Sequence, residues 1–181
     1  MANVPTVKVT VDLSPDSFKN LQAYFKNMRH TLRTSFATQV RKKSRESIKK
    51  YAISNLNSTI GLTGYAPTGE MATSWINSSM GNVALLINTH PNSAAVEFGT
   101  GIRGSKYSHP NAGEVGYHYN VNGHTSAWVY SPDGNGTEFY ATEGQEAHRF
   151  MYYALIDFKN STDIQNIGIE AFMKYFKDVR L

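Results

Sequence analysis

The chain has 181 residues and a mass of 20.2 kDa, a length that predicts a single domain. Hydrophobic residues make up 40% of it, enough for a core, so extended intrinsic disorder is not expected. The absence of cysteine excludes disulfides, thiolate zinc sites, iron–sulfur clusters and thiol catalysis. The longest aliphatic run, Val83–Ile87, is too short to span a bilayer, and the N-terminus lacks the pattern of a signal peptide. We therefore expect a protein that starts in the cytosol and has no membrane partner.

Charge and glycine divide the chain near residue 60. Residues 1–60 carry eleven Lys/Arg and three Asp/Glu, a net charge of +8. Residues 61–181 carry seven and eleven, a net of −4, and the two parts sum to the overall +4. All 14 glycines lie at or after Gly61. These shifts predict a change of structure type at this point, within one domain of residues 1–181.

The first third is predicted to form a strand and one long helix. Val7, Val9, Val11 and Leu13 alternate with polar residues, which is typical of a half-buried strand. Ser14-Pro15-Asp16 then supplies an N-cap, a proline at the first helical position and an acid on the helix dipole.

Residues 15–60 are predicted to be that helix. Asp16 to Ile60 contains neither Gly nor Pro, and its apolar residues are spaced by threes and fours. They are Phe18, Leu21, Phe25, Met28, Leu32, Phe36, Val40, Ile48 and Tyr51. Such a helix is about 67 Å long, so we expect it to project, to kink or to pack on a neighbouring subunit. The weakly helical hydroxyl residues Thr31, Thr34, Ser35 and Thr38 are the expected place for a kink.

The remainder predicts an antiparallel sheet and two helices. After a loop at 61–71, strands are expected at 73–80 and 83–89 around Gly81-Asn82, and at 93–98 before Gly99-Thr100-Gly101. A loop at 102–115 precedes an expected hairpin of 117–121 and 125–130 and a short strand at 139–140. Helices are expected at 147–158 and after the Thr162-Asp163 cap, the last with Ile164, Ile167, Ala171, Tyr175 and Val179 on one face. The predicted class is α+β: an N-terminal strand and long α-helix, an antiparallel β-sheet, and two C-terminal helices.

Histidines and carboxylates offer a candidate metal site. His90, His109, His118 and His124 lie near Glu97 and Glu114, and imidazole with carboxylate suits zinc or iron. No pair has a tight ligand spacing such as HExxH, and there is no GxSxG motif or phosphate-binding loop. We therefore expect no catalytic residue, no cofactor and no metal. A metal-dependent hydrolase using His90, Glu97, His118 and His124 stands as the enzymatic alternative.

A basic run follows in the second half of the long helix. It comprises Arg41, Lys42, Lys43, Arg45, Lys49 and Lys50, opposed only by Glu46. Such a run suits non-specific contacts with nucleic-acid phosphates. The favoured interpretation is a solvated face, or a patch that meets an acidic face of a neighbouring subunit or partner. Nucleic-acid binding remains an alternative function.

Three segments in order resemble motifs of a known protein family. They are Ala66–Trp75 (APTGEMATSW), Ala94–Gly101 (AAVEFGTG) and Gly144–Leu155 (GQEAHRFMYYAL). Together with the long helix they are similar to the neck, or tail-completion, proteins of long-tailed bacteriophages, which join the DNA-filled head to the tail. The resemblance covers about residues 15–160. Arg149 and Tyr153 stand where the family usually has proline, the insertion at 102–140 is longer than expected, and residues after 160 have no counterpart.

The resemblance implies a structural virion protein at the head–tail junction, assembled in the host cytoplasm. Expected partners are copies of itself in a six-fold ring, a head-closure (stopper) protein, a tail terminator or tail tube protein, and non-specifically the packaged DNA. A tail terminator is the alternative within this class. The residues carried over as structural are Thr68, Gly69, Glu97, Gly99, Thr100, Gly101, Gly144, Ala147 and Phe150.

Physical roles can be assigned to these motifs. Glu97 is expected to accept backbone N–H bonds across the Gly99-Thr100-Gly101 turn, whose glycines allow close approach. The 144–155 helix is expected to bury Phe150, Met151 and Leu155 against the sheet. Replacing Glu97 with alanine or Gly99 with valine should impair folding or assembly rather than a reaction.

Overall fold

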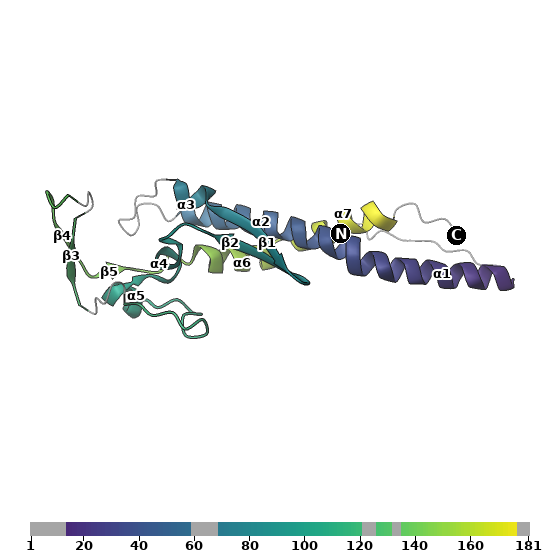
Figure 1. Cartoon of the computed structure of the whole chain (residues 1–181), viewed down its shortest axis with the longest axis horizontal. Coiled ribbons are helices and arrows are strands. Elements are labelled where there is room, and N and C mark those ends of the chain that lie inside the picture. Colours follow the sequence, from purple (N-terminus) through teal and green to yellow (C-terminus); the bar gives the residue numbers. More distant parts are fainter. Residues whose placement is uncertain (1–13, 59–68, 121–125, 132–134, 177–181) are drawn as a thin grey trace.

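The computed structural model describes residues 14–58, 69–120, 126–131 and 135–176. The fold is elongated, with helix α1 at one end and strands β3 and β4 at the other (Figure 1). The elements are α1 (Pro15–Thr31), the π-helical turn η1 (Leu32–Phe36), α2 (Ala37–Ser58), α3 (Glu70–Thr73), β1 (Trp75–Met80), β2 (Val83–Asn88), α4 (Ser93–Phe98), α5 (Gly101–Lys106), β3 (Trp128–Tyr130), β4 (Tyr140–Thr142), β5 (Gly144–Gln145), α6 (Phe150–Asn160) and α7 (Asp163–Phe176). The α+β class is confirmed, whereas the strand expected at residues 7–13 lies outside the described residues.

One uninterrupted helical segment runs from Pro15 to Ser58 through α1, η1 and α2. Ser14 caps it, since its side chain accepts the Ser17 N–H at 3.2 Å. At ~1.5 Å per residue this segment is about 66 Å long, and the prediction that it passes Lys50 is confirmed. At the place where a kink was expected the helix contains the π turn η1, and the Thr34 hydroxyl there bonds the His30 carbonyl at 2.9 Å. Hydroxyls that bond the preceding turn in this way disturb helix geometry.

The N-terminal part of this helix projects from the rest of the molecule. No residue of α1 is buried, and the rings of Phe18 and Phe25 remain 51% and 56% exposed. By contrast α2 buries Ala52 and Leu56 and lies along α6 and α7. The helix is therefore half packed and half projecting, because the domain is shorter than the helix (Figure 1). No helix in the described part of the chain is long and apolar enough to cross a membrane.

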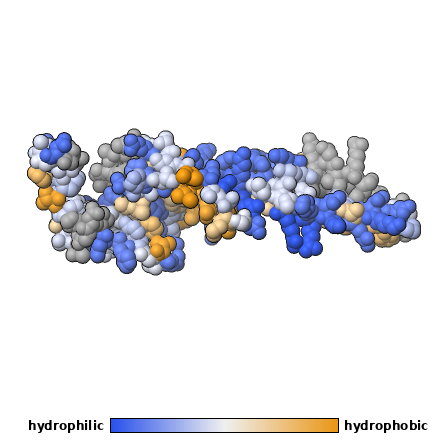
Figure 2. All heavy atoms as spheres, viewed as in Figure 1, coloured by the Kyte–Doolittle hydropathy of each residue, from blue (hydrophilic) through white to orange (hydrophobic). Residues whose placement is uncertain are grey.

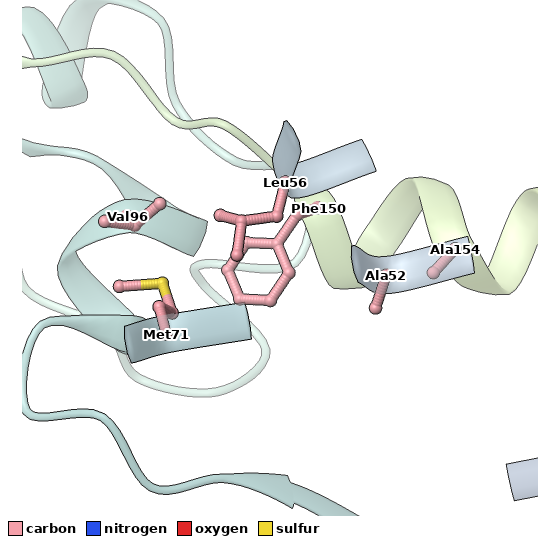
Figure 3. Close-up of a cluster of buried hydrophobic side chains, with 6 residues drawn as sticks. All are labelled: Ala52, Leu56, Met71, Val96, Phe150 and Ala154. Carbon is pink, nitrogen blue, oxygen red and sulfur yellow. The ribbon is translucent and has the colours of Figure 1, made fainter. Parts of the chain in front are cut away.

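The core lies between α2, α6 and the short elements α3 and α4. Ala52 and Ala154 are fully buried where α2 and α6 meet, and small side chains there let the two helices approach closely. Leu56, Met71, Val96 and Phe150 fill the adjoining volume (Figure 3). The ring of Trp75 meets that of Phe150 edge-on, with centroids 6.2 Å apart.

One core expectation is wrong. Phe150 is buried and Met151 packs against the core, but Leu155 is 53% exposed. The buried residues of α6 are Phe150, Ala154 and Phe158, spaced by fours. Leu155 is one residue further along, about 100° around the helix from that stripe, so it faces outward.

The sheet expected as one unit is two separate two-stranded sheets among the described residues. The β1–β2 hairpin has the predicted position, and pairs Ile76 with Ile87 and Met80 with Val83. The strand predicted at 93–98 is wrong, because this segment is helix α4. Its alanines are good helix formers, and Gly99 ends the helix with a φ of 83°. The loop expected at 102–115 likewise contains most of helix α5.

The hairpin predicted from 117–121 and 125–130 is also not the observed pairing. Strand β3 pairs with β4, with Trp128 opposite Thr142, and residues 117–120 form no strand. The Gly101 N–H instead bonds the Tyr119 carbonyl at 2.7 Å, and the Tyr117 hydroxyl bonds the Gly99 carbonyl at 2.9 Å. These tertiary bonds hold residues 117–120 against the Gly99-Thr100-Gly101 turn. The Asn122-Gly123 turn lies outside the described residues.

The C-terminal helices are both present. α6 begins at Phe150, three residues later than predicted, because the N–H groups of His148 and Arg149 bond the carbonyls of Val96 and Glu97 in α4 instead of a helical turn. α7 begins at Asp163, as the Thr162-Asp163 cap predicted, and buries Ile167 and Ala171. Val179 lies outside the described residues.

Candidate functional site

The second and third family-like segments lie side by side, and we call their contact the Glu97 junction (residues 94–101 against 144–152). Isolated β-bridges join Thr100 to Gln145 and Gly101 to Gly144. The Gln145 side chain donates to the Ala95 carbonyl at 2.8 Å. The N–H groups of His148 and Arg149 donate to the carbonyls of Val96 and Glu97 at 2.9 and 3.1 Å. Two segments about fifty residues apart in sequence therefore act as one structural unit.

Glycines are required at this contact by the space available. A Cβ on Gly144 would lie 2.0 Å from the Thr100 carbonyl oxygen. A Cβ on Gly99 would lie 2.8 Å from both the Ala147 nitrogen and the Gln145 oxygen. Both glycines have positive φ, 96° and 83°, which side-chain-bearing residues rarely adopt. The expectation that the motif glycines allow close backbone approach is borne out.

Glu97 is the N-terminal cap of α6, supplied from another helix. The residue is 7% exposed, and its carboxylate accepts the Met151 N–H at 2.8 Å and the Tyr152 N–H at 3.0 Å. These are two of the N–H groups that a helix start leaves unsatisfied, and a carboxylate there also complements the helix dipole. The expectation that Glu97 bonds across the Gly99-Thr100-Gly101 turn is wrong. It bonds the start of α6 instead, because the last turn of α4, which carries Glu97, lies next to the first turn of α6.

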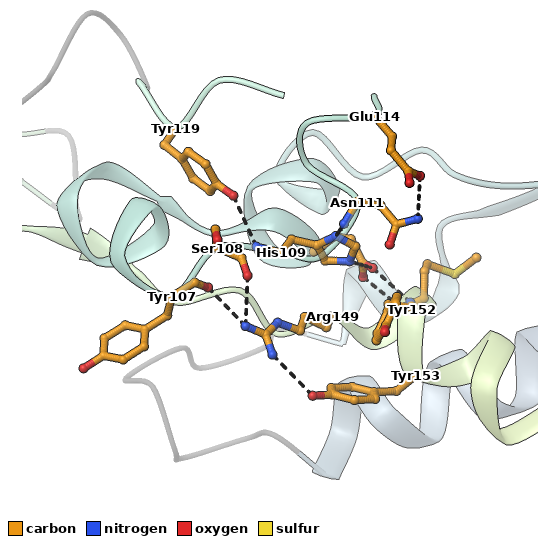
Figure 4. Close-up of polar contacts among 11 residues, drawn as sticks. Tyr107, Ser108, His109, Asn111, Glu114, Tyr119, Arg149, Tyr152 and Tyr153 are labelled. Atoms are coloured by element: carbon orange, nitrogen blue, oxygen red, sulfur yellow. Dashed lines mark hydrogen bonds and ion pairs between the residues drawn. The ribbon is translucent and has the colours of Figure 1, made fainter. Parts of the chain in front are cut away.

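His109 completes the junction from the segment after α5. Its Nε2 lies 3.1 Å from Glu97 Oε1, and its Nδ1 accepts the Asn111 N–H at 3.0 Å (Figure 4). Since Nδ1 accepts, the ring proton is on Nε2 and is donated to Glu97. The imidazole, 5% exposed, packs between Phe98 and Tyr152, with ring centroids 4.6 and 5.3 Å away. Nothing in the spacing of the histidines distinguished His109 from the other five.

Arg149 links the start of α6 to the residues that follow α5. It is the one residue other than glycine with positive φ (56°) among those the structure describes. Its guanidinium donates to the carbonyls of Tyr107 and Ser108 at 3.2 and 3.1 Å (Figure 4). The strained backbone is thus held by bonds that join the start of α6 to the end of α5. In the sequence, the replacement of an expected proline by Arg149 was the only sign that this position differs.

Burial shifts two titratable groups near the junction. Desolvation lowers the pKa of His148, which is 4% exposed. Burial, followed by the neighbouring Tyr119, raises the pKa of Tyr117. Both shifts favour the neutral form, so these side chains are uncharged near neutral pH.

We predict that His148 makes the protein less stable in mild acid. The folded-state pKa lies below the unfolded value of 6.5, so the unfolded chain binds the proton first as pH falls. The destabilisation is absent above the unfolded pKa and grows as pH falls below it, until the folded-state pKa is reached. Urea unfolding of wild type and His148→Gln at pH 7.5 and 5.5 should show a smaller acid loss in the variant. Exposed His118→Gln is the control, and an equal loss in all three proteins contradicts the prediction.

The remaining predicted motif residues are placed as follows. Gly69 begins α3 with a φ of 82°, consistent with a turn glycine, and Thr68 lies outside the described residues. Ala147 passes directly beside Gly99, and Phe150 is in the core. The motif residues that the structure describes around 97–101 and 144–150 come together, whereas Gly69 belongs to a separate turn.

The histidines considered as metal ligands do not gather in the described structure. Within residues 14–58, 69–120, 126–131 and 135–176, no three His, Asp or Glu side chains form a metal-binding group. His90 lies 3.8 Å from Glu70, His118 is exposed, and His124 is outside the described residues. In the buried pair of Glu97 and His109, Glu97 caps the start of α6 and His109 packs against Phe98 and Tyr152.

Half of the basic run has partners within the chain. Arg41 and Arg45 donate to the carbonyls of Asn82 and Ser78 in the β1–β2 hairpin, at 2.9 and 2.5 Å. Lys43 pairs with Glu170 of α7. Lys42, Lys49 and Lys50 have no polar partner among the described residues. Arg41, Lys43 and Arg45 therefore hold the β1–β2 hairpin and α7 to α2. That the run meets an acidic face of a neighbouring subunit or partner stays a prediction.

At the Glu97 junction, the Glu97 carboxylate is bonded both to the start of α6 and to His109. No protein-family model matches this chain, and no curated protein and no solved structure matches it.

Proposed function

We propose that this chain is a structural subunit of a bacteriophage neck, a tail-completion protein that joins the filled head to the tail. The order of the three family-like segments supports the proposal, as does the packing of two of them into a rigid junction. The observation that carries it is the projecting helix α1, of which no residue is buried although Phe18 and Phe25 lie on it. Exposed apolar surface on this scale is typical of a protein that buries it against another chain.

Further apolar surface supports an assembly role. Ile76, Met80, Val83 and Ile87 are between 44% and 71% exposed on the β1–β2 hairpin. By the pairing register they share one face of it. Val129 and Phe139, at the far end, are more than 60% exposed. Figure 2 shows hydrophobic residues at both ends of the molecule and over the middle, separated by hydrophilic surface. Several separate apolar faces suit a subunit with several neighbours.

An enzymatic role has less support. The strongest acid–base pair, Glu97 with His109, is buried and already bonded to backbone N–H groups. The grooves between elements are open to solvent, and one of about 500 Å³ lies between α5 and residues 117–120. Nucleic-acid binding by the basic run is also weakened, since three of its six cations are bonded within the chain.

The proposal is tested by the three lysines of α2 that have no partner in the described structure. In a phage lacking this gene, complementation with Lys42→Gln/Lys49→Gln/Lys50→Gln should give fewer joined particles and more free tails and free filled heads. The reason is that a cationic surface on the subunit steers and holds an acidic partner. Electron microscopy counts the three kinds of particle.

The matched control is Lys106→Gln/Lys159→Gln/Lys174→Gln, which makes the same change of charge at exposed positions on α5, α6 and α7. It should join heads to tails normally. If wild-type protein fails to restore joining, the neck assignment is wrong. If the α2 variant joins particles normally but DNA is released slowly or leaks, the lysines face the DNA path.

A further inference from the structure

Two surfaces that could bring copies of this chain together lie at opposite ends of the molecule. They are helix α1 and the β3–β4 ribbon (residues 128–130 and 140–142), as Figure 1 shows. The helix from Pro15 to Ser58 is continuous, so α1 cannot fold back onto the ribbon of its own chain. Any contact between the two is therefore between chains.

One long face of α1, continued by the first residue of η1, is apolar. Phe18, Leu21, Phe25, Met28 and Leu32, here called the α1 stripe, fall within an arc of about 80° at 3.6 residues per turn. Their spacing of three and four is that of a helix that packs against a partner. Phe18, Phe25 and Leu32 are 51%, 56% and 37% exposed.

A basic flank lies along one side of this stripe. Lys19, Lys26 and Arg29 occupy the next arc of about 80°, and all three are exposed. Asp16 is the only acid in α1, so the helix has a net charge of +2. A surface that covers the α1 stripe is expected to present carboxylates beside an apolar strip.

The β3–β4 ribbon has this composition. Its register places Val129 opposite Ala141, and alternation puts Phe139 on the same face. Val129 and Phe139 are 62% and 67% exposed. Glu138, Glu143 and Glu146 are the charged residues of the described segments 126–131 and 135–146, giving them a net charge of −3. By the same alternation Glu143 lies on the Val129–Phe139 face. Glu138 lies on the opposite face, where it accepts the Tyr140 hydroxyl at 2.8 Å, and Glu146 pairs with Arg103.

In the described structure the ribbon is attached to the rest of its chain through Trp128. The Trp128 ring lies against Gly101, where a Cβ would be 2.8 Å from the ring. Beyond that anchor, β3 and β4 pair only with each other in the described structure. Two-stranded ribbons are marginally stable alone and gain from a helix packed on one face.

We propose that the α1 stripe of one copy packs on the Val129–Phe139 face of a second copy, with Lys26 and Arg29 beside Glu143. This head-to-tail contact joins two different surfaces, so repetition generates a closed ring or an open filament. The inference rests on the proposed function only in that copies of the chain assemble.

Disulfide trapping tests the contact directly, because the chain has no cysteine of its own. Phe25→Cys protein is mixed with Phe139→Cys protein at about 1 mM, a concentration that populates even a contact of about 4 kcal/mol, and oxidised. Heterodimer yield is read by mass spectrometry. The control replaces Phe25→Cys with Asn27→Cys, an exposed position on the opposite side of α1. We expect at least a tenfold higher yield for the first pair, equivalent to about 1.4 kcal/mol.

Charge reversal provides the second measurement. Lys26→Glu/Arg29→Glu in the Phe25→Cys chain should lower the yield, and Glu143→Lys in the Phe139→Cys chain should restore part of it. All these positions are exposed, so folding, checked by circular dichroism, should be unchanged.

Other occupants of the α1 stripe would overturn the proposal. They are revealed by Phe25→Cys linking chiefly to itself, to an Ile87→Cys chain through the hairpin face, or to another tail protein. Equal yields with Asn27→Cys, or no heterodimer, would also overturn it. If rings form through another surface, this inference fails while the neck function stands. If the cross-link forms but heads and tails join without the protein, only the function fails.

Discussion

Gly144→Ala is expected to be among the most destabilising single substitutions in this protein. The added methyl would lie 2.0 Å from the Thr100 carbonyl oxygen, and the backbone at 144 has a φ of 96°. Relief requires the two segments of the Glu97 junction to separate, which would break the bridges between 100–101 and 144–145. We expect a loss of more than about 4 kcal/mol, comparable with the whole stability of many domains. Gly99→Val should be similarly severe.

Two control glycines separate crowding from backbone strain. Gly81 has a φ of 57°, but nothing lies within 4 Å of the place that an added methyl would occupy, so Gly81→Ala should cost only about 1 kcal/mol. Gly113 has neither positive φ nor a close neighbour, and Gly113→Ala should be close to neutral. Chemical denaturation followed by circular dichroism ranks the three alanine variants by their free energy of unfolding. A stability of Gly144→Ala near that of Gly113→Ala would contradict the close contact at the junction.

Glu97→Ala is expected to cost about 3 kcal/mol or more. It removes the acceptor for the Met151 and Tyr152 N–H groups and for His109 Nε2. The buried His109 donor would then lose its partner, and the two part-buried N–H groups would lose the acceptor at the start of α6. Glu97→Gln keeps one acceptor oxygen but turns an amide NH₂ towards a donor. Its loss of unfolding free energy should therefore lie between zero and that of Glu97→Ala. Urea unfolding of the three proteins gives these differences.

Two controls test whether the loss of stability is specific to the contacts of Glu97. Glu114→Ala removes an exposed carboxylate that bonds only the Asn111 side chain among the described residues, and should leave stability nearly unchanged. A double-mutant cycle with His109→Ala should give a coupling energy of about 1–3 kcal/mol, because the two side chains share a bond. Additive effects of the two substitutions would show that His109 acts by packing alone.

Local sequence patterns determined much of this fold. The helix from Ser14 could be predicted because its cap, its lack of Gly and Pro, and its apolar spacing all act within a few residues. The β1–β2 hairpin and the start of α7 were predictable for the same reason. The π turn fell where hydroxyl residues compete for backbone bonds.

Tertiary structure decided the rest, through bonds between residues far apart in the chain. Residues 93–98 form a helix because Glu97 must reach the start of α6, and 117–120 are not a strand because Tyr117 and Tyr119 bond the turn at 99–101. The pairing of His109 with Glu97 spans twelve residues with no periodic pattern. Glu97 and the motif glycines were marked as structural by the resemblance to a family, and the close backbone approach at the glycines was expected because glycine has no side chain. Which helix that acid caps depends on packing, which no local pattern encodes.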